Sequence, residues 1–133
     1  MNVEGTCHCG LITFEAEIDP NAVRICHCTD CQTITGSAYR ANVQATAAKF
    51  LLRSGTPKIY IKTADSGNKR AHAFCANCGT PIYASDPYEP RFYSLRIGTL
   101  KQRATLLPTL QIWCSSALPW VTDLRDIPRI DRQ

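Results

Sequence analysis

Seven of the eight cysteines in this 133-residue chain fall into three tight groups. Their spacings are C-x-C, C-x-C-x-x-C and C-x-x-C, at which short loops present several thiolates to one metal ion. A thiolate prefers a soft cation, and zinc in a structural site takes four such ligands in a tetrahedron. The pattern therefore indicates metal binding. The groups are Cys7 and Cys9; Cys26, Cys28 and Cys31; and Cys75 and Cys78.

A shared turn pairs the first group with the third. In TCHCG and in FCANCG a glycine, Gly10 or Gly79, directly follows the second cysteine. A positive φ at that glycine lets the backbone fold back so that its amides can point at the sulfurs. We therefore predict one structural zinc site, which closes a loop of roughly seventy residues and on which the fold depends. Its ligands are Cys7, Cys9, Cys75 and Cys78.

The remaining group offers three ligands and leaves one position of a tetrahedral zinc open. In an extended C-x-C segment the side chains of Cys26 and Cys28 project to the same side, and the following turn brings Cys31 back toward them. An open position is typical of a catalytic or exchangeable metal. We therefore predict a catalytic zinc at this triad, which makes two zinc ions per chain, with the second held less tightly than the first.

Two alternatives stay open on the residues alone. The paired cysteines could form a redox dithiol or a disulfide instead of a metal site. The triad could be closed by a fourth ligand from His27, His72 or Cys114, which would make both sites structural. His27 stands between two ligands on a strand, so its side chain is expected to point away from their metal. Cys114, beside Trp113 on a predicted strand, is expected to be a small buried hydrophobe.

The composition is that of one globular domain, residues 1–133. Hydrophobic residues make up 44% of the chain, and no apolar run reaches the roughly 18 residues that a membrane-spanning helix requires. The N-terminal segment MNVEGTCHCG has neither the basic region nor the apolar region of a secretory signal. We therefore expect a cytoplasmic protein, whose cysteines stay reduced and whose partners include no membrane.

The formal net charge of +4 is weak support for nucleic acid as a partner. It counts every cysteine as neutral, and seven thiolates on two divalent ions would bring the chain close to neutrality. The basic residues are scattered among acids and not interleaved with aromatic residues, as on a solvated surface. The sequence gives no indication of the oligomeric state. These basic residues include Lys69, Arg70, Arg91, Arg96, Lys101 and Arg103.

Short segments of alternating apolar and polar residues predict an all-β fold of antiparallel sheets. Leu11–Ile18 places alternate residues from Ile12 onward on one face, and an Asp-Pro-Asn turn ends it. One helical turn is predicted over Thr29–Ile34 with Thr29 as N-cap, and the last dozen residues are expected to be irregular. Further strands are predicted over Val23–Ile25, Tyr39–Val43, Phe50–Arg53, Lys58–Lys62, Arg70–Phe74, Pro81–Ala84, Phe92–Ile97 and Thr109–Trp113.

The order of motifs resembles the glutathione-dependent formaldehyde-activating enzyme family, whose domain is shared with centromere protein V. The motifs are G-x-C-x-C-G, then C-x-C-x-x-C-Q with GSAY, F-C-x-x-C-G-T-P-I, IGTL, and IW and PW near the end. The resemblance runs from about Gly5 to Pro128, and all seven cysteine positions are filled. It implies a zinc-tied fold of several coiled antiparallel β-sheets, similar to methionine-R-sulfoxide reductases. It also implies that the four-cysteine zinc is structural and that Cys26, Cys28 and Cys31 hold the catalytic zinc.

The resemblance further implies carbon–sulfur lyase activity with a small thiol and an aldehyde as partners. Glutathione, as co-substrate, would be joined to formaldehyde to give S-hydroxymethylglutathione, or the reverse. A zinc that carries three thiolates is a weak Lewis acid, so we favour a role in holding the thiol over one in polarising the aldehyde. Candidate contacts for glutathione are Arg40, for a carboxylate, and Gln32, Ser37 and Asn42, for its peptide groups.

One position departs from the family pattern. Family members often carry histidine in a P-x-x-H-I-W segment, where this chain has Gln111, and glutamine cannot act as a general acid or base. The identity of the aldehyde and the thiol is therefore open. Two functions of other classes remain alternatives: a scaffold in which both zinc ions are structural, and a redox switch in which oxidation of the triad releases zinc.

Overall fold

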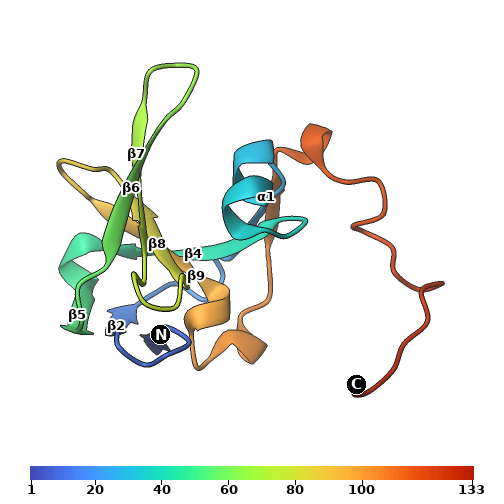
Figure 1. The fold of residues 1–133 in the computed structure, drawn as a ribbon, viewed down its shortest axis with the longest axis horizontal. Helices are drawn as coiled ribbons and strands as arrows, with labels where there is room; N and C mark the ends of the chain where they lie inside the picture. Colours follow the sequence, from blue (N-terminus) through green and yellow to red (C-terminus); the bar gives the residue numbers. More distant parts are fainter.

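The computed structural model describes residues 1–133, and it confirms the all-β class: ten strands form two sheets beside a single α-helix (Figure 1). The smaller sheet has the order β1-β2-β5 and the larger one β10-β3-β4-β9-β8-β7-β6. The elements are β1 (Asn2–Thr6), β2 (Thr13–Glu17), β3 (Arg24–Cys26), α1 (Thr29–Thr35), β4 (Arg40–Thr46), β5 (Phe50–Ser54), β6 (Lys58–Thr63), β7 (Lys69–Phe74), β8 (Pro81–Ser85), β9 (Phe92–Arg96) and β10 (Leu110–Ile112), with short 3₁₀ turns η1 (Ala47–Lys49), η2 (Ile97–Thr99), η3 (Arg103–Thr105) and η4 (Cys114–Ser116).

Neighbouring strands pair antiparallel, as predicted, with one exception at the edge of the larger sheet. There β10 runs parallel to β3, with Gln111 opposite Ile25. Parallel neighbours need a long connection, and here most of the chain lies between the two strands. The segment around Gln111 is thereby placed against the strand that leads into the cysteine triad.

The hydrophobic core lies between the two sheets. The smaller sheet contributes Phe14, and the larger one contributes Val43 and Leu95, all of them buried. The ring of Phe50 closes the layer, with its centroid 4.4 Å from that of Tyr93. Alternation along β2 and β4 thus sends apolar residues inward, as the period of two requires.

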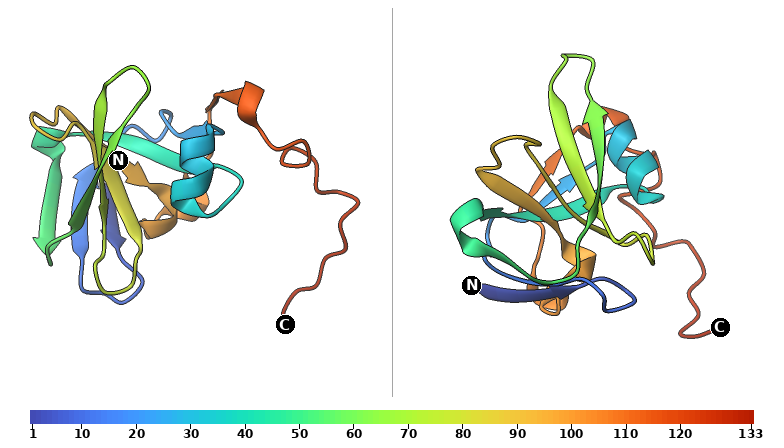
Figure 2. Two further views of the ribbon diagram at one scale, coloured as in Figure 1. Left: turned by 45° about the horizontal axis from the view of Figure 1, so that its top comes forward. Right: turned by 60° about the vertical axis from the view of Figure 1, so that its left-hand side comes forward.

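Helix α1 lies beside the β6–β7 hairpin, on the side of the larger sheet away from this core (Figure 2). An ion pair between Lys62 of β6 and Asp30 of α1 joins the two elements. The prediction of Thr29 as N-cap is wrong by one residue. The N-cap is Cys28, whose sulfur accepts a hydrogen bond from the amide of Cys31.

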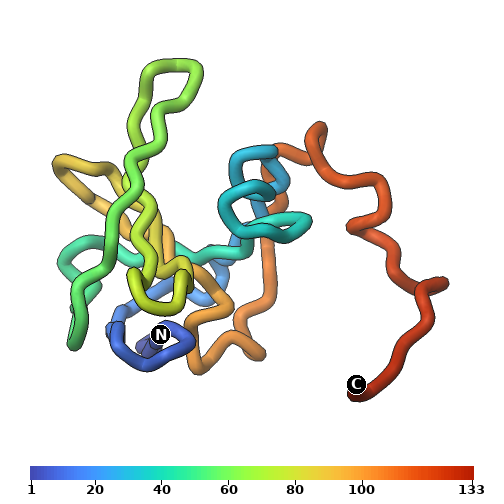
Figure 3. The backbone as a smooth tube through the Cα atoms, in the orientation of Figure 1, coloured from blue at the N-terminus to red at the C-terminus, as the bar shows by residue number.

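The two ends of the chain differ in how well the sequence predicts them. Strand β1 is not predicted, because Val3 is its one large apolar residue. The segment after Ser116 has no regular structure and runs away from the body of the protein, and it includes the last dozen residues, for which this is expected (Figure 3). None of the helices has both the length and the hydrophobicity that are needed to cross a bilayer.

Gly5 of β1 pairs with Phe14 of β2, and this close packing can be tested by substitution. A Cβ atom at Gly5 would overlap the ring of Phe14 at Cζ, and that ring is buried in the core. We predict that Gly5→Ala lowers the free energy of unfolding by about 2 kcal/mol, since the buried ring must move. Gly98→Ala is the matched control, because its Cβ would meet no atom within 4 Å. Urea titrations at one fixed zinc concentration measure both, and equal stabilities would contradict this packing.

Candidate metal centres

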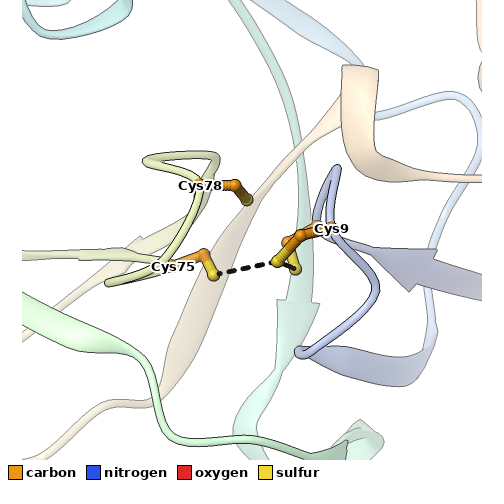
Figure 4. A group of neighbouring side chains, drawn as sticks. Cys9, Cys75 and Cys78 are labelled. Atoms are coloured by element: carbon orange, nitrogen blue, oxygen red, sulfur yellow. Dashed lines mark hydrogen bonds between the residues drawn. The ribbon is translucent and has the colours of Figure 1, made fainter.

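Four cysteine sulfurs from two distant turns meet beside the core (Figure 4). The turn between β1 and β2 carries Cys7 and Cys9, and the turn between β7 and β8 carries Cys75 and Cys78. The four Sγ atoms lie within 4.8 Å of one another, with 3.5 Å between Cys7 and Cys9 and 3.7 Å between Cys9 and Cys75. The structure therefore brings together the first and third groups, as the glycine turns predict.

The two glycines adopt the expected left-handed conformation. Their φ angles are 81° at Gly10 and 74° at Gly79. Each amide donates back to the first cysteine of its group, at 3.1 Å to the carbonyl of Cys7 and at 2.8 Å to that of Cys75. The first turn also aims the amide of Ile12 at the Cys7 sulfur, at 3.2 Å. Amides directed at sulfur stabilise the thiolate form that a metal binds.

Two of the four thiols are shifted toward the thiolate. Hydrogen bonds from the side chain and the backbone of Thr80 lower the pKa of Cys78 to about 5. A hydrogen bond from Asn77 lowers the pKa of Cys9 as well. Because the metal ligand is the thiolate, these hydrogen bonds prepare the cluster for a cation at neutral pH.

The remaining three cysteines converge where β3 passes into α1. Cys26 ends β3, Cys28 caps the helix, and Cys31 lies in its first turn. The Sγ atom of Cys31 lies 3.1 Å from that of Cys28 and 3.3 Å from that of Cys26. Cys26 and Cys31 are buried, whereas Cys28 is half-buried. The capping turn thus builds a three-sulfur face that stays accessible at Cys28.

Both clusters have the spacing of metal sites and not of disulfides. Sulfurs on a tetrahedral zinc at about 2.3 Å lie about 3.8 Å apart, whereas a disulfide bond is about 2.0 Å long. The sulfur–sulfur distances given above run from 3.1 to 3.7 Å, and all eight cysteines are free thiols. The two clusters could therefore bind metal ions, one with four sulfurs and the other with three.

No fourth protein ligand joins the triad. Its three sulfurs form a cluster that includes no histidine, carboxylate or further cysteine. The expectation that Cys114 is buried on a strand is wrong: β10 ends at Ile112, and Cys114 is exposed in η4. Trp113 has a φ of 58° and is 63% exposed, so the chain turns outward before Cys114.

His27 and Gln111 form a pair on the β10 side of the triad. The ring of His27 is 2% exposed, and its Nε2 donates to Oε1 of Gln111 at 2.8 Å. As expected from its place between two ligands, His27 is not part of the sulfur cluster. Gln111, the residue that departs from the family pattern, therefore holds the strand segment between Cys26 and Cys28 in place.

Of the four candidate contacts for glutathione, two already make hydrogen bonds within the protein and a third is exposed. The Nε2 of Gln32 donates to the carbonyls of His27 at 2.7 Å and Ser116 at 2.9 Å, which uses both of its N–H groups. The Oδ1 of Asn42 accepts a hydrogen bond from a buried serine hydroxyl at 2.9 Å. Ser37, after the end of α1, is exposed. Gln32 thus links α1 to the segments around His27 and Ser116, and only its side-chain oxygen stays free to accept a hydrogen bond from a ligand.

Arg40, the fourth candidate, lies next to the triad. It stands opposite Cys26 in the pairing of β3 with β4, so the two side chains share a face of the sheet. Burial acts to raise the pKa of Cys28, but hydrogen bonds from Cys31 and the charge of Arg40 lower it overall. Burial raises the pKa of Cys31, and Arg40 opposes that rise. Nε and Nη1 of Arg40 are buried without a hydrogen-bond partner.

The assignment of Arg96 to a solvated surface is wrong. Arg96 is 6% exposed on β9, and its Nη2 lies 3.3 Å from Nδ1 of His72, which is 7% exposed. Burial lowers the pKa of Arg96 to about 9 and that of His72 to about 4, so at neutral pH the arginine is charged and the histidine is not. No motif marks this pair. Only the strand register places Arg96 opposite Asn42, two residues from Arg40.

Comparisons with known proteins point to one family. Residues 2–116 match the model of a family described as "Glutathione-dependent formaldehyde-activating enzyme". The chain is 28% identical over 94 residues to a Halomonas elongata protein named "Putative glutathione-dependent formaldehyde-activating enzyme", which covers 68% of this chain and 60% of that protein. The chain thus spans about three fifths of that relative. A crystal structure of a Rhodobacter sphaeroides protein is similar in fold, with a TM-score of 0.63 and 20% identity over 81% of this chain and 98% of that one.

The neutral, buried His72 predicts a pH dependence of stability. Its pKa is about 4 in the folded protein against an ordinary 6.5, so between these values the unfolded chain binds more protons and stability falls as the pH falls. Relative to His72→Gln, the wild type should lose on the order of 1 to 2 kcal/mol from about pH 7 to about pH 4, after allowance for solvent screening. Urea titrations at each pH measure the difference, and comparing variants cancels the loss of metal in acid. Parallel curves for the two proteins would contradict the prediction.

Proposed function

Because the chain belongs to the glutathione-dependent formaldehyde-activating enzyme family, we propose that it joins the thiol of glutathione to formaldehyde at a zinc ion held by the cysteine triad. The sulfur bonds to the carbonyl carbon, the C=O bond becomes single, and the thiol proton passes to the oxygen. The product is S-hydroxymethylglutathione, nothing is oxidised or reduced, and the reverse step is a carbon–sulfur lyase reaction.

The observation that supports this proposal best is that Cys26, Cys28 and Cys31 converge without a fourth protein ligand. Structural zinc sites are closed by four protein ligands, whereas catalytic ones have three and an open position. Zinc, when bound, would supply that open position and the positive charge that keeps a substrate thiol ionised at neutral pH. The half-exposed Cys28 marks the side from which a small thiol can approach.

Arg40 is the residue that we propose to balance the charge at the triad. Three thiolates exceed the charge of a divalent ion by one, and the guanidinium beside Cys26 offsets that excess. Its Nε and Nη1, which have no partner in the protein, can donate to a carboxylate of glutathione. The amide oxygen of Gln32 and the hydroxyl of Ser37 are the further contacts that we propose.

We propose a structural zinc at the four-cysteine cluster. Two of its sulfurs, those of Cys7 and Cys75, belong to the hydrophobic core, so a metal there would be continuous with the packing of both sheets. Seven cysteines at metal-site spacing, none of them in a disulfide, fit a reducing compartment, and we propose that the protein acts in the cytoplasm.

The activity is tested by two-dimensional exchange NMR on formaldehyde and glutathione. Zinc-loaded protein should accelerate their exchange over buffer, and Cys28→Ser should reduce the acceleration by about tenfold or more, because one of three metal ligands is lost. Cys114→Ser is the matched control, since Cys114 is exposed and outside both clusters. No acceleration by the wild type would count against the proposed function.

Zinc stoichiometry separates the enzyme from the two alternatives. We expect two zinc ions per chain, with the triad metal removed first by a mild chelator and absent from a folded Cys28→Ser variant. Cys75→Ser should instead lower the stability of the whole chain. If both metals resist the chelator and Cys28→Ser unfolds, both sites are structural and the protein is a scaffold. Release of the triad zinc by peroxide at physiological levels would support the redox switch.

A further inference from the structure

A cavity of about 480 Å³ lies between α1, the β6–β7 hairpin and the turn after Cys78. Its volume falls in the range of small-molecule sites. Neither a cysteine nor a carboxylate lines it, so it is distinct from both metal clusters, and most of its wall is apolar. The lining residues that matter for its chemistry are Ile34, Tyr60, Phe74, Pro81, His72 and Arg96.

The cavity is lined by residues from elements that carry cysteines of both clusters. Ile34 belongs to α1, the helix that carries Cys31 of the triad, and Phe74 directly precedes Cys75 of the four-cysteine cluster.

Arg96 is a buried cation without an anion. Its Nε and Nη1 have no hydrogen-bond partner, and none of the five ion pairs of the structure includes it. The charge of Arg40 nearby adds repulsion and no compensation. A buried charge without a counterion is costly, and an anion on its free N–H groups would remove that cost.

His72 orients this cation. Its Nδ1 accepts from Nη2 of Arg96 at 3.3 Å, which fixes the guanidinium and leaves the proton of the neutral ring on Nε2. The histidine thus adds no charge of its own. A single guanidinium in an apolar wall matches a monoanion, because the second charge of a phosphate would stay uncompensated.

We propose that this cavity binds a carboxylate on a short chain, with the carboxylate on Arg96 and the chain against Ile34 and Phe74. Two sources share this chemistry: a small aliphatic acid, and the glycyl carboxylate of glutathione. The site goes beyond the proposed reaction and does not depend on it, since binding can be measured without turnover.

Binding is tested by titrating the zinc-loaded full chain with butyrate and recording amide and arginine Nε–H shifts by NMR. We expect butyrate to shift the Arg96 Nε–H signal and butyramide, which has no charge, to leave it unchanged. Arg96→Gln should raise the Kd of butyrate about tenfold or more, because the charged partner is lost. The exposed Arg91→Gln is the matched control. Ile34→Trp keeps the arginine and fills the cavity, so it should also block binding. This variant tests the site even if Arg96→Gln alters the fold.

Competition identifies the source of the carboxylate. If glutathione displaces butyrate and glutathione esterified at its glycyl carboxylate does not, the site holds that arm of glutathione. If butyrate and glutathione bind together, the site takes a separate acid. The proposal is overturned if neither butyrate nor glutathione shifts the Arg96 signal, if butyramide binds as well as butyrate, or if Arg96→Gln and Ile34→Trp both leave binding unchanged.

Discussion

Two turns that are distant in sequence and belong to different sheets are held with four sulfurs at one point, and the arrangement of both sheets depends on this contact. Cys9 and Cys75 are 66 residues apart along the chain, yet their sulfurs are 3.7 Å apart. Cys7 and Cys75 pack in the same core as Phe14 of the smaller sheet and Leu95 of the larger one. Closing so long a loop is entropically unfavourable, so the cluster has to be stabilised by this packing and by the metal that we propose there.

The two faces of the larger sheet differ in character: apolar side chains lie on one face, and charged side chains lie on the other. Val43 and Leu95, which are opposite each other, face the core. Arg40 and Arg96 lie on the other face, with Cys26 beside Arg40. Cysteine sulfurs and guanidinium groups therefore lie on one face of the sheet, where Cys26 and Arg96 are both buried.

The sequence predicts the cysteine clusters and most strands but not the surroundings of the triad. Spacing and the two glycines are local signals, so the ligand groups can be read directly. Arg96 carries no local signal, because its burial follows from the register of β9 on β4 and from a helix that covers that face. Cys114 is predicted as buried because IW resembles a strand, but the left-handed backbone at Trp113 ends the strand one residue earlier. Long-range pairing decides the first outcome, and the local backbone at Trp113 decides the second.

The parallel pairing of β10 with β3 has a consequence for the order of folding during synthesis. All four sulfurs of the four-cysteine cluster are present once Cys78 has left the ribosome, whereas the triad gains its support from Gln111 and Ser116 only when nearly the whole chain has emerged. The segment that carries the three sulfurs is therefore synthesised early, but it reaches its final geometry last. Until that strand arrives, the metal that we propose at the triad would lie on an unsupported edge of the sheet, open to exchange with other thiols.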